Sequence, residues 1–168
     1  MRNIILIGMS LSGKTTLAYE ISKKLNCNFI DTDKLIEEEN KITINEIFKV
    51  KGEKFFRDLE SGVIEKIKYV DNSIISTGGG MPIYNKNIDK LKNIGIVVYL
   101  RVPLEILLKR AKNVENRPLI KGNYKDKVKN IYNSRFKVYE SADIIIDLGN
   151  NLEENLDNII NVIEKLNK

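Results

Sequence analysis

The chain has 168 residues, of which 42% are hydrophobic and 30% charged, and its formal net charge is +5. These values fit one globular domain over residues 1–168, and they exclude a large multidomain protein or a disordered chain. No apolar run approaches the roughly 20 residues that cross a bilayer, so we expect a cytoplasmic protein with no membrane contact.

The near absence of two residue types, histidine and cysteine, excludes several kinds of catalytic and metal site. The chain has no histidine and a single cysteine, Cys27. An intrachain disulfide and a cysteine metal cluster are therefore impossible, and we expect Cys27 to be a small buried hydrophobe. Without histidine, a Ser-His or Cys-His nucleophile and an imidazole base are excluded. Carboxylates, lysines and backbone groups remain for any catalysis.

Strands and helices are predicted to alternate along the chain. Short apolar, β-branched runs predict strands at 3–8, 28–31, 73–77, 95–100 and 143–147. Helical spacing and helix-forming composition predict helices at 14–25, 45–51, 54–69 and 152–166. We expect Phe55, Leu152 and Leu166 to lie on the core faces of their helices. This order predicts an α/β fold with a parallel sheet covered by helices on both sides, a three-layer α/β/α arrangement.

The segment Gly8–Thr15 reads GMSLSGKT and matches the phosphate-loop pattern G-x-x-x-x-G-K-[ST] between a predicted strand and a predicted helix. The glycines allow a tight turn in which backbone amides converge on phosphate oxygens at a helix N-terminus. Lys14 would place its charge between the β- and γ-phosphates, and Thr15 would bind Mg²⁺. We expect nucleotide contacts from Gly8, Ser10, Ser12, Gly13, Lys14, Thr15 and Thr16.

Two carboxylates, Asp31 and Asp33, follow the second predicted strand. Residues two apart on an extended chain point to the same side, so both should lie beside the phosphate loop, near Mg²⁺ and the acceptor. With no histidine present, Asp33 is the best candidate to hold or deprotonate an acceptor hydroxyl. The alternative is an Asx turn that caps the next helix.

Three further features are consistent with binding of an anionic acceptor. Arg57 shares a helix face with Glu60, which could orient it; the alternative is a solvated ion pair. The turn Gly78–Gly80 follows the third predicted strand and would let backbone amides approach an anion. Arg117 lies in the polar stretch 112–123, which suits a mobile lid that delivers an arginine, although an exposed basic loop would look the same.

Positive charge is concentrated in residues 109–137, where ten Lys or Arg residues stand against Glu115 and Asp126. Such a segment can bind nucleic acid or a phosphorylated small molecule. An ATP-dependent nucleic-acid binder is therefore one hypothesis, but no RNP-like aromatic pattern accompanies the charge. The nearer rival is a small P-loop kinase acting on gluconate or a nucleoside monophosphate.

Taken in order, these motifs resemble shikimate kinase over nearly the whole chain. The motifs are GMSLSGKT, the Asp31 and Asp33 pair, FRDLE at 56–60, Gly78–Gly80, RPL at 117–119, and Arg135 with Tyr139. The resemblance implies transfer of the γ-phosphoryl group of ATP to the 3-hydroxyl of shikimate, a step of aromatic biosynthesis. It also implies a five-stranded P-loop fold of the nucleoside monophosphate kinase type with a closing lid. The combination of FRDLE, the glycine turn and RPL argues against the rival kinases.

The resemblance also implies a role for individual residues. The acceptor would be bound by Asp33, Arg57, Gly78, Gly79, Gly80 and Arg135. The groups acting on the transferring phosphoryl or the acceptor hydroxyl would be Lys14, Asp33 and Arg117; Mg²⁺ would lie by Thr15 and Asp31, and adenine by Arg110. The implied partners are ATP and shikimate, with no nucleic acid, and a monomer is expected. Leu11 stands where this family usually has glycine, so we expect a stiffer or differently shaped loop crest.

Overall fold

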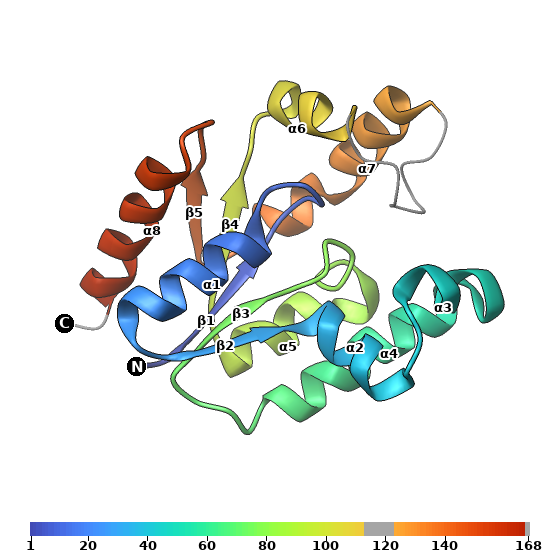
Figure 1. Ribbon diagram of the computed structural model, residues 1–168, viewed down its shortest axis with the longest axis horizontal. Coiled ribbons are helices and arrows are strands. Elements are labelled where there is room, and N and C mark those ends of the chain that lie inside the picture. Colours follow the sequence, from blue (N-terminus) through green and yellow to red (C-terminus); the bar gives the residue numbers. More distant parts are fainter. Residues whose placement is uncertain (113–122, 167–168) are drawn as a thin grey trace.

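The computed structural model describes residues 1–112 and 123–166, and Figure 1 shows its arrangement. Five strands form one sheet in the order β2-β3-β1-β4-β5, and every neighbouring pair is parallel. The strands are β1 (Asn3–Ile7), β2 (Asn28–Asp31), β3 (Ser73–Ser76), β4 (Gly95–Arg101) and β5 (Ile144–Asp147). The central strand β1 is fully buried, as its continuous apolar sequence requires. The predicted parallel sheet is confirmed.

Helices cover both faces of this sheet. They are α1 (Lys14–Leu25), α2 (Thr32–Asn40), α3 (Ile44–Val50), α4 (Gly52–Ile67), α5 (Asn87–Ile94), α6 (Leu104–Ala111), α7 (Tyr124–Tyr139) and α8 (Leu152–Leu166), with a 3₁₀ turn η1 (Tyr84–Lys86). In Figure 1, α1 and α8 lie on one side of the sheet, and α4 and α5 lie on the other. Within the described part of the chain, no helix is both long and apolar enough to cross a bilayer.

The strand and helix ends differ slightly from the sequence prediction. Asp143 was expected inside the last strand, but its carboxylate accepts the backbone N–H of Val97 at 2.8 Å. The side chain thus supplies the bond that a ladder carbonyl would supply, and β5 begins one residue later at Ile144. Helix α4 likewise begins and ends two residues earlier than the predicted 54–69.

Three hydrophobic side chains predicted for the core are exposed instead. Phe55, Leu152 and Leu166 expose 40%, 48% and 42% of their surface. Phe55 lies in the first turn of α4, and Leu152 and Leu166 lie at the two ends of α8. The sheet does not cover these helix ends. Cys27 is half-buried rather than buried. The amphipathic pattern is therefore correct for the helix centres and wrong at these ends.

Candidate active site

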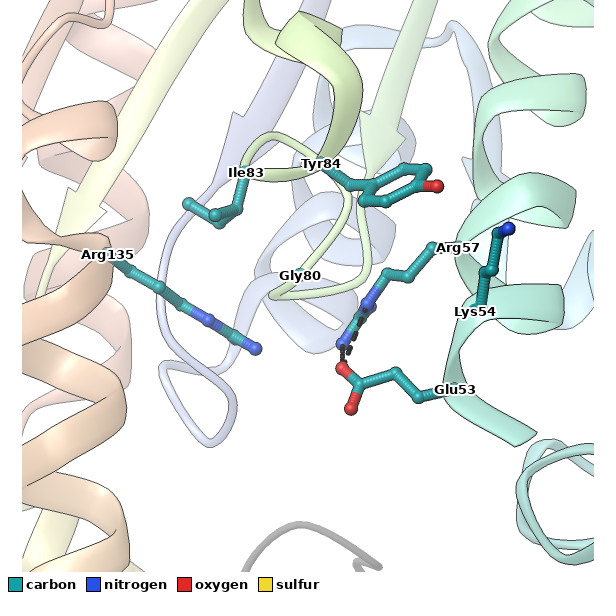
Figure 2. A pocket seen from close by; sticks show the side chains of 7 residues that line it. All are labelled: Glu53, Lys54, Arg57, Gly80, Ile83, Tyr84 and Arg135. Carbon is teal, nitrogen blue, oxygen red and sulfur yellow. Dashed lines mark hydrogen bonds and ion pairs between the residues drawn. The ribbon is translucent and has the colours of Figure 1, made fainter.

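The candidate site lies at the carboxyl edge of the sheet, where the segments after β1, β2 and β3 meet. In a parallel sheet these ends lie at one edge, which is where ligands bind in open α/β folds. Two cavities share the turn Gly78–Gly80 as a common wall. One, of about 320 Å³, is lined by Leu11, Gly13, Lys14, Thr15, Thr16, Asp33, Thr77, Gly79 and Arg110. The other, of about 470 Å³, is lined by Glu53, Lys54, Arg57, Gly80, Ile83, Tyr84 and Arg135 (Figure 2).

The backbone of the phosphate loop adopts conformations that require its glycines. Gly8 has a φ of +143°, and a Cβ there would lie 2.8 Å from the carbonyl oxygen of Leu100. Gly13 has a φ of +90° and is the N-cap of α1, so the loop enters the helix without a side chain over its amides. The first turn of α1, with the positive end of its helix dipole, therefore lines the smaller cavity, as expected for a phosphate site.

The side chain of Lys14 forms hydrogen bonds with other residues of the same loop. Its ammonium group donates to the carbonyl oxygens of Gly8 at 3.0 Å and Met9 at 2.8 Å, and to the hydroxyl of Ser12 at 3.3 Å. The side chain is buried within the loop yet lines the smaller cavity. A cation is thus held at the place where the sequence pattern puts the nucleotide phosphates.

The loop crest keeps a glycine-type backbone although its residue is a leucine. Leu11 has a φ of +71°, in the left-handed region that side chains with a Cβ rarely adopt. Its carbonyl oxygen accepts a hydrogen bond from Nη1 of Arg110 at 2.8 Å. Arg110 also lines the smaller cavity, so this guanidinium braces the crest from the α6 side. The adenine role of Arg110 stays a prediction.

Asp31 joins the second strand to the phosphate loop. Its Oδ2 accepts the hydroxyl of Thr15 at 2.8 Å, and the hydroxyl of Ser76 lies 3.4 Å from that of Thr15. Its Oδ1 accepts the backbone N–H groups of Asp33 and Lys34, so Asp31 is also the N-cap of α2. The capping alternative is therefore confirmed for Asp31, and its role toward Mg²⁺ stays a prediction.

The extended backbone that was expected through both aspartates is wrong for Asp33. The chain turns into α2 at Thr32, so Asp33 belongs to the first helical turn and not to an extended strand. Its carboxylate faces the glycine turn: a Cβ on Gly78 would lie 2.5 Å from Asp33 Oδ1. Asp33 still lines the smaller cavity, and the predicted proximity of both aspartates to the phosphate loop is confirmed.

Oxygen donors at Thr15 and Asp31 fit a magnesium ion. Mg²⁺ prefers hard oxygen ligands and usually keeps water or substrate phosphate oxygens in its shell, so one hydroxyl and one carboxylate suffice. Among residues 1–112 and 123–166, no group of three acidic, cysteine or histidine side chains could hold a metal by itself. The donor set thus matches a cation that arrives with a phosphate ligand.

The glycine turn is packed against polar side chains at each position. A Cβ on Gly79 would lie 3.1 Å from the backbone nitrogen of Ser10 and 3.3 Å from Nη1 of Arg135. A Cβ on Gly80 would overlap the guanidinium group of Arg57. Glycine therefore lets the backbone of the turn approach these polar groups closely, as the sequence predicted.

Arg57 is held by two carboxylates from its own helix. Its Nη1 donates to Glu60 Oε2 at 2.7 Å, while Nη2 and Nε donate to Glu53 Oε1 at 2.8 and 3.2 Å. The predicted contact with Glu60 is confirmed, but the solvated alternative is wrong because Arg57 and Glu60 are 7% and 0% exposed. Sequence reasoning missed Glu53, although its spacing of four residues from Arg57 is a recognised helix pairing.

The environment of Glu60 is unusual for a carboxylate. Burial raises its pKa to about 7, against the opposing effect of the Arg57 charge, and the negative charge of Asp33 adds to the rise. Its Oε2 is bound to Arg57, whereas Oε1 has no hydrogen-bond partner among the described residues. Oε1 points toward the turn, 2.8 Å from where a Cβ on Gly78 would lie.

Helix α7 contributes the opposite wall. Figure 2 shows Arg135 reaching from α7 toward the guanidinium of Arg57, which comes from α4. Four residues further along α7, the hydroxyl of Tyr139 donates to the carbonyl oxygen of Gly79, and its ring stacks on Tyr99 with centroids 5.1 Å apart. Burial raises the pKa of Tyr139, so this hydroxyl is neutral and acts as a donor. This contact was not predicted from the sequence.

The predicted site residues are brought together with one exception. Lys14, Thr15, Thr16, Asp33, Gly79 and Arg110 line one cavity, and Arg57, Gly80 and Arg135 line the other. Ser10 lies against the turn and Ser12 accepts from Lys14. Arg117, and all but the two end residues of the expected lid 112–123, lie outside the described residues.

The five-stranded parallel sheet and its phosphate loop define a nucleotide-binding protein of the P-loop class. A family model described as shikimate kinase matches residues 11–164. The chain belongs to the shikimate kinase family.

Two relatives show how far the similarity extends. The shikimate kinase of Clostridium botulinum (strain Okra / Type B1) is 52% identical over 167 residues, covering 98% of both chains. The structure of shikimate kinase from Acinetobacter baumannii in complex with shikimate has a TM-score of 0.92 and 32% identity, covering 98% of this chain and 94% of that one. A gluconokinase from Sinorhizobium meliloti 1021, with a TM-score of 0.56, 14% identity, and 99% and 98% coverage, shares the fold alone.

Proposed function

We propose that this chain transfers the γ-phosphoryl group of ATP to the 3-hydroxyl of shikimate. The observation that carries the proposal is the position of Arg57 and Arg135, which face each other across a cavity next to the phosphate loop. Guanidinium groups bind carboxylates through paired, charge-assisted hydrogen bonds, and shikimate has one carboxylate with hydroxyls on the same ring. Membership of the family supports this acceptor over gluconate or a nucleoside monophosphate.

On the nucleotide side, the phosphates would lie over the amides at the start of α1. Lys14 would exchange one of its carbonyl partners for a phosphate oxygen, since its ammonium already lines that cavity. Thr15 and Asp31 would hold Mg²⁺, which supplies positive charge to the phosphate oxygens when bound. Arg110, which braces the loop crest, would lie near the adenine.

On the acceptor side, Arg57 and Arg135 would hold the carboxylate while Asp33 orients the reacting hydroxyl and accepts its proton. Asp33 lines the cavity of the phosphate loop and faces the turn shared with the acceptor cavity, so one carboxylate can reach both substrates. The amides of Gly79 and Gly80 would add backbone contacts, while that of Gly78 donates to the hydroxyl of Thr32 at 3.2 Å and would hold the turn in place. Phosphoryl transfer depends mainly on such positioning and on charge stabilisation.

Two further assignments concern the role of Arg117 and the oligomeric state of the protein. Arg117 would approach the transferring phosphoryl group from a lid over residues 112–123. We assign the whole chain, residues 1–168, to one kinase domain that acts as a monomer. Arginine suits the Arg117 role because a guanidinium stabilises charge on transferring phosphoryl oxygens in many kinases and GTPases.

An acceptor screen tests the proposal. Purified protein with ATP and Mg²⁺ should release ADP with shikimate, and not with gluconate or a nucleoside monophosphate. Arg57→Ala and Arg135→Ala should each raise KM for shikimate by about ten- to a hundredfold, the range for losing a hydrogen bond to a charged group, with smaller effects on kcat. Turnover of gluconate or a nucleotide without turnover of shikimate would disprove the assignment.

A further inference from the structure

Two carboxylates contact Arg57, and their surroundings differ sharply. Glu60 and Glu53 both bind the guanidinium, yet the Glu60 side chain is 0% exposed and that of Glu53 is 54% exposed. We propose that Glu53 is an exchangeable partner of Arg57, which the carboxylate of the acceptor replaces. This inference rests on the proposed function, because it takes shikimate as the acceptor.

The contact geometry places Glu53 where an acceptor carboxylate would bind. Glu53 Oε1 accepts from both Nη2 and Nε of Arg57, at 2.8 and 3.2 Å, along one edge of the guanidinium. Figure 2 shows the Glu53 carboxylate beside the end of Arg57, on the side open to the cavity and to Arg135. A carboxylic acid held by both arginines would need this same region of the cavity.

Burial decides which carboxylate can leave. Exposed ion pairs contribute little to stability because water and salt screen them, so Glu53 can turn into solvent at small cost. Glu60 has no such freedom, since moving it would leave a buried guanidinium and a buried carboxylate without each other. Glu60 is therefore the permanent partner of Arg57 and Glu53 the replaceable one.

Charge explains why this exchange favours an anion. The described lining of the larger cavity has three cations, Lys54, Arg57 and Arg135, and a single carboxylate, Glu53. An acceptor carboxylate that replaces Glu53 restores the charge pairing of Arg57. A neutral acceptor offers no negative charge in return, so Glu53 stays on Arg57 and keeps that group occupied. Glu53 is thus a competitor that an anionic acceptor displaces and that an uncharged ligand of similar shape leaves in place.

The test compares two variants of the same helix in the full chain. Glu53→Gln removes the competing charge and keeps the size of the side chain. Glu65→Gln is the matched control: it lies on α4, pairs with Lys68 at 3.0 Å and does not line the cavity. KM and kcat are measured for shikimate and for its primary carboxamide, with the carboxamide assayed as a competitive inhibitor if turnover is slow. Calorimetry gives the Kd of shikimate without turnover.

Glu53→Gln should lower KM and Kd for shikimate by about two- to fivefold, in line with loss of one exposed ion pair, while kcat changes by less than about twofold. The carboxamide should gain less than shikimate, and the control should match the wild type. A raised or unchanged KM for shikimate, or an equal gain for the carboxamide, would overturn the inference while the function stands. A wild-type chain that neither binds nor phosphorylates shikimate would overturn both.

Discussion

The hydroxyl of Tyr139 donates a hydrogen bond to the carbonyl oxygen of Gly79 at 2.5 Å, across 60 residues of sequence. Tyr139 is 1% exposed and lies one helical turn after Arg135 on α7. The same helix thus positions a guanidinium in the acceptor cavity and fixes the turn that separates the two cavities. Movement of α7 would move both.

We therefore expect Tyr139→Phe to impair acceptor binding more than its conservative character suggests. Loss of the bond frees the Gly79 carbonyl and loosens the turn, so KM for shikimate should rise about two- to tenfold and the free energy of unfolding should fall by about 1 kcal/mol. Steady-state kinetics and urea denaturation measure the two effects. Tyr132→Phe, on the same helix with its ring beside Phe136, is the control. Equal behaviour of the two variants would contradict the coupling.

Lys14→Ala should abolish phosphoryl transfer while the protein stays folded. The ammonium holds two loop carbonyls and supplies the cation beside the phosphates, so we expect kcat to fall by at least about a hundredfold and stability by about 1–3 kcal/mol. Coupled assays and circular dichroism measure the two. Lys24→Ala, which removes an exposed partner of Asp157 from the same helix, should leave both unchanged. Full activity in Lys14→Ala would refute the phosphate-loop interpretation.

Gly80→Ala should damage the acceptor site specifically. Its Cβ would overlap the Arg57 guanidinium, so the arginine must move, and KM for shikimate should rise by at least about tenfold, the cost of losing a charged hydrogen bond. Gly62→Ala is the comparison, because a Cβ there meets no described atom within 4 Å and α4 gains a better helix former. We expect Gly62→Ala to stabilise the fold by about 0.5–1 kcal/mol with normal kinetics. A normal KM in Gly80→Ala would show that the turn can shift freely.

Glu60 should make the folded protein less stable as the pH rises. Burial raises its pKa from 4.5 to about 7, so with rising pH the unfolded chain loses this proton before the folded chain does. The stabilisation is complete below about pH 4.5, declines up to about pH 7 and is absent above it. Relative to Glu60→Gln, the wild-type free energy of unfolding should therefore fall by about 1–3 kcal/mol across that window. Denaturation series of both proteins measure this; parallel pH curves would contradict it.

Local patterns were sufficient to predict much of this molecule. The apolar run of β1 and the motif that follows it specify a buried parallel strand and a phosphate loop, and the structure has both. The contact of Arg57 with Glu60 follows from helical spacing, because residues three apart share a face. These features depend on neighbours in the chain, which a sequence displays directly.

Other features depend on where distant segments meet. The extended backbone expected at Asp33 was wrong because Asp31 is the N-cap of α2, so the chain is already helical at Asp33. The bond from Tyr139 to Gly79 depends on the packing of α7 against the sheet, and no spacing along the chain encodes it. The pairing of Glu53 with Arg57 could have been predicted from their spacing of four residues on a helix. That Glu53 lines the cavity could be seen only in the tertiary structure.

The crowded turn at Gly78–Gly80 also limits how the enzyme can be redesigned. Because added atoms at these positions collide with groups that we propose hold the substrates, mutagenesis aimed at new acceptors has little room there. Space is available instead around Glu53, Lys54 and Tyr84, whose side chains form the outer wall of the larger cavity in Figure 2. A combinatorial library at those three positions can alter the accepted ring substituents while the backbone between the two substrates stays intact.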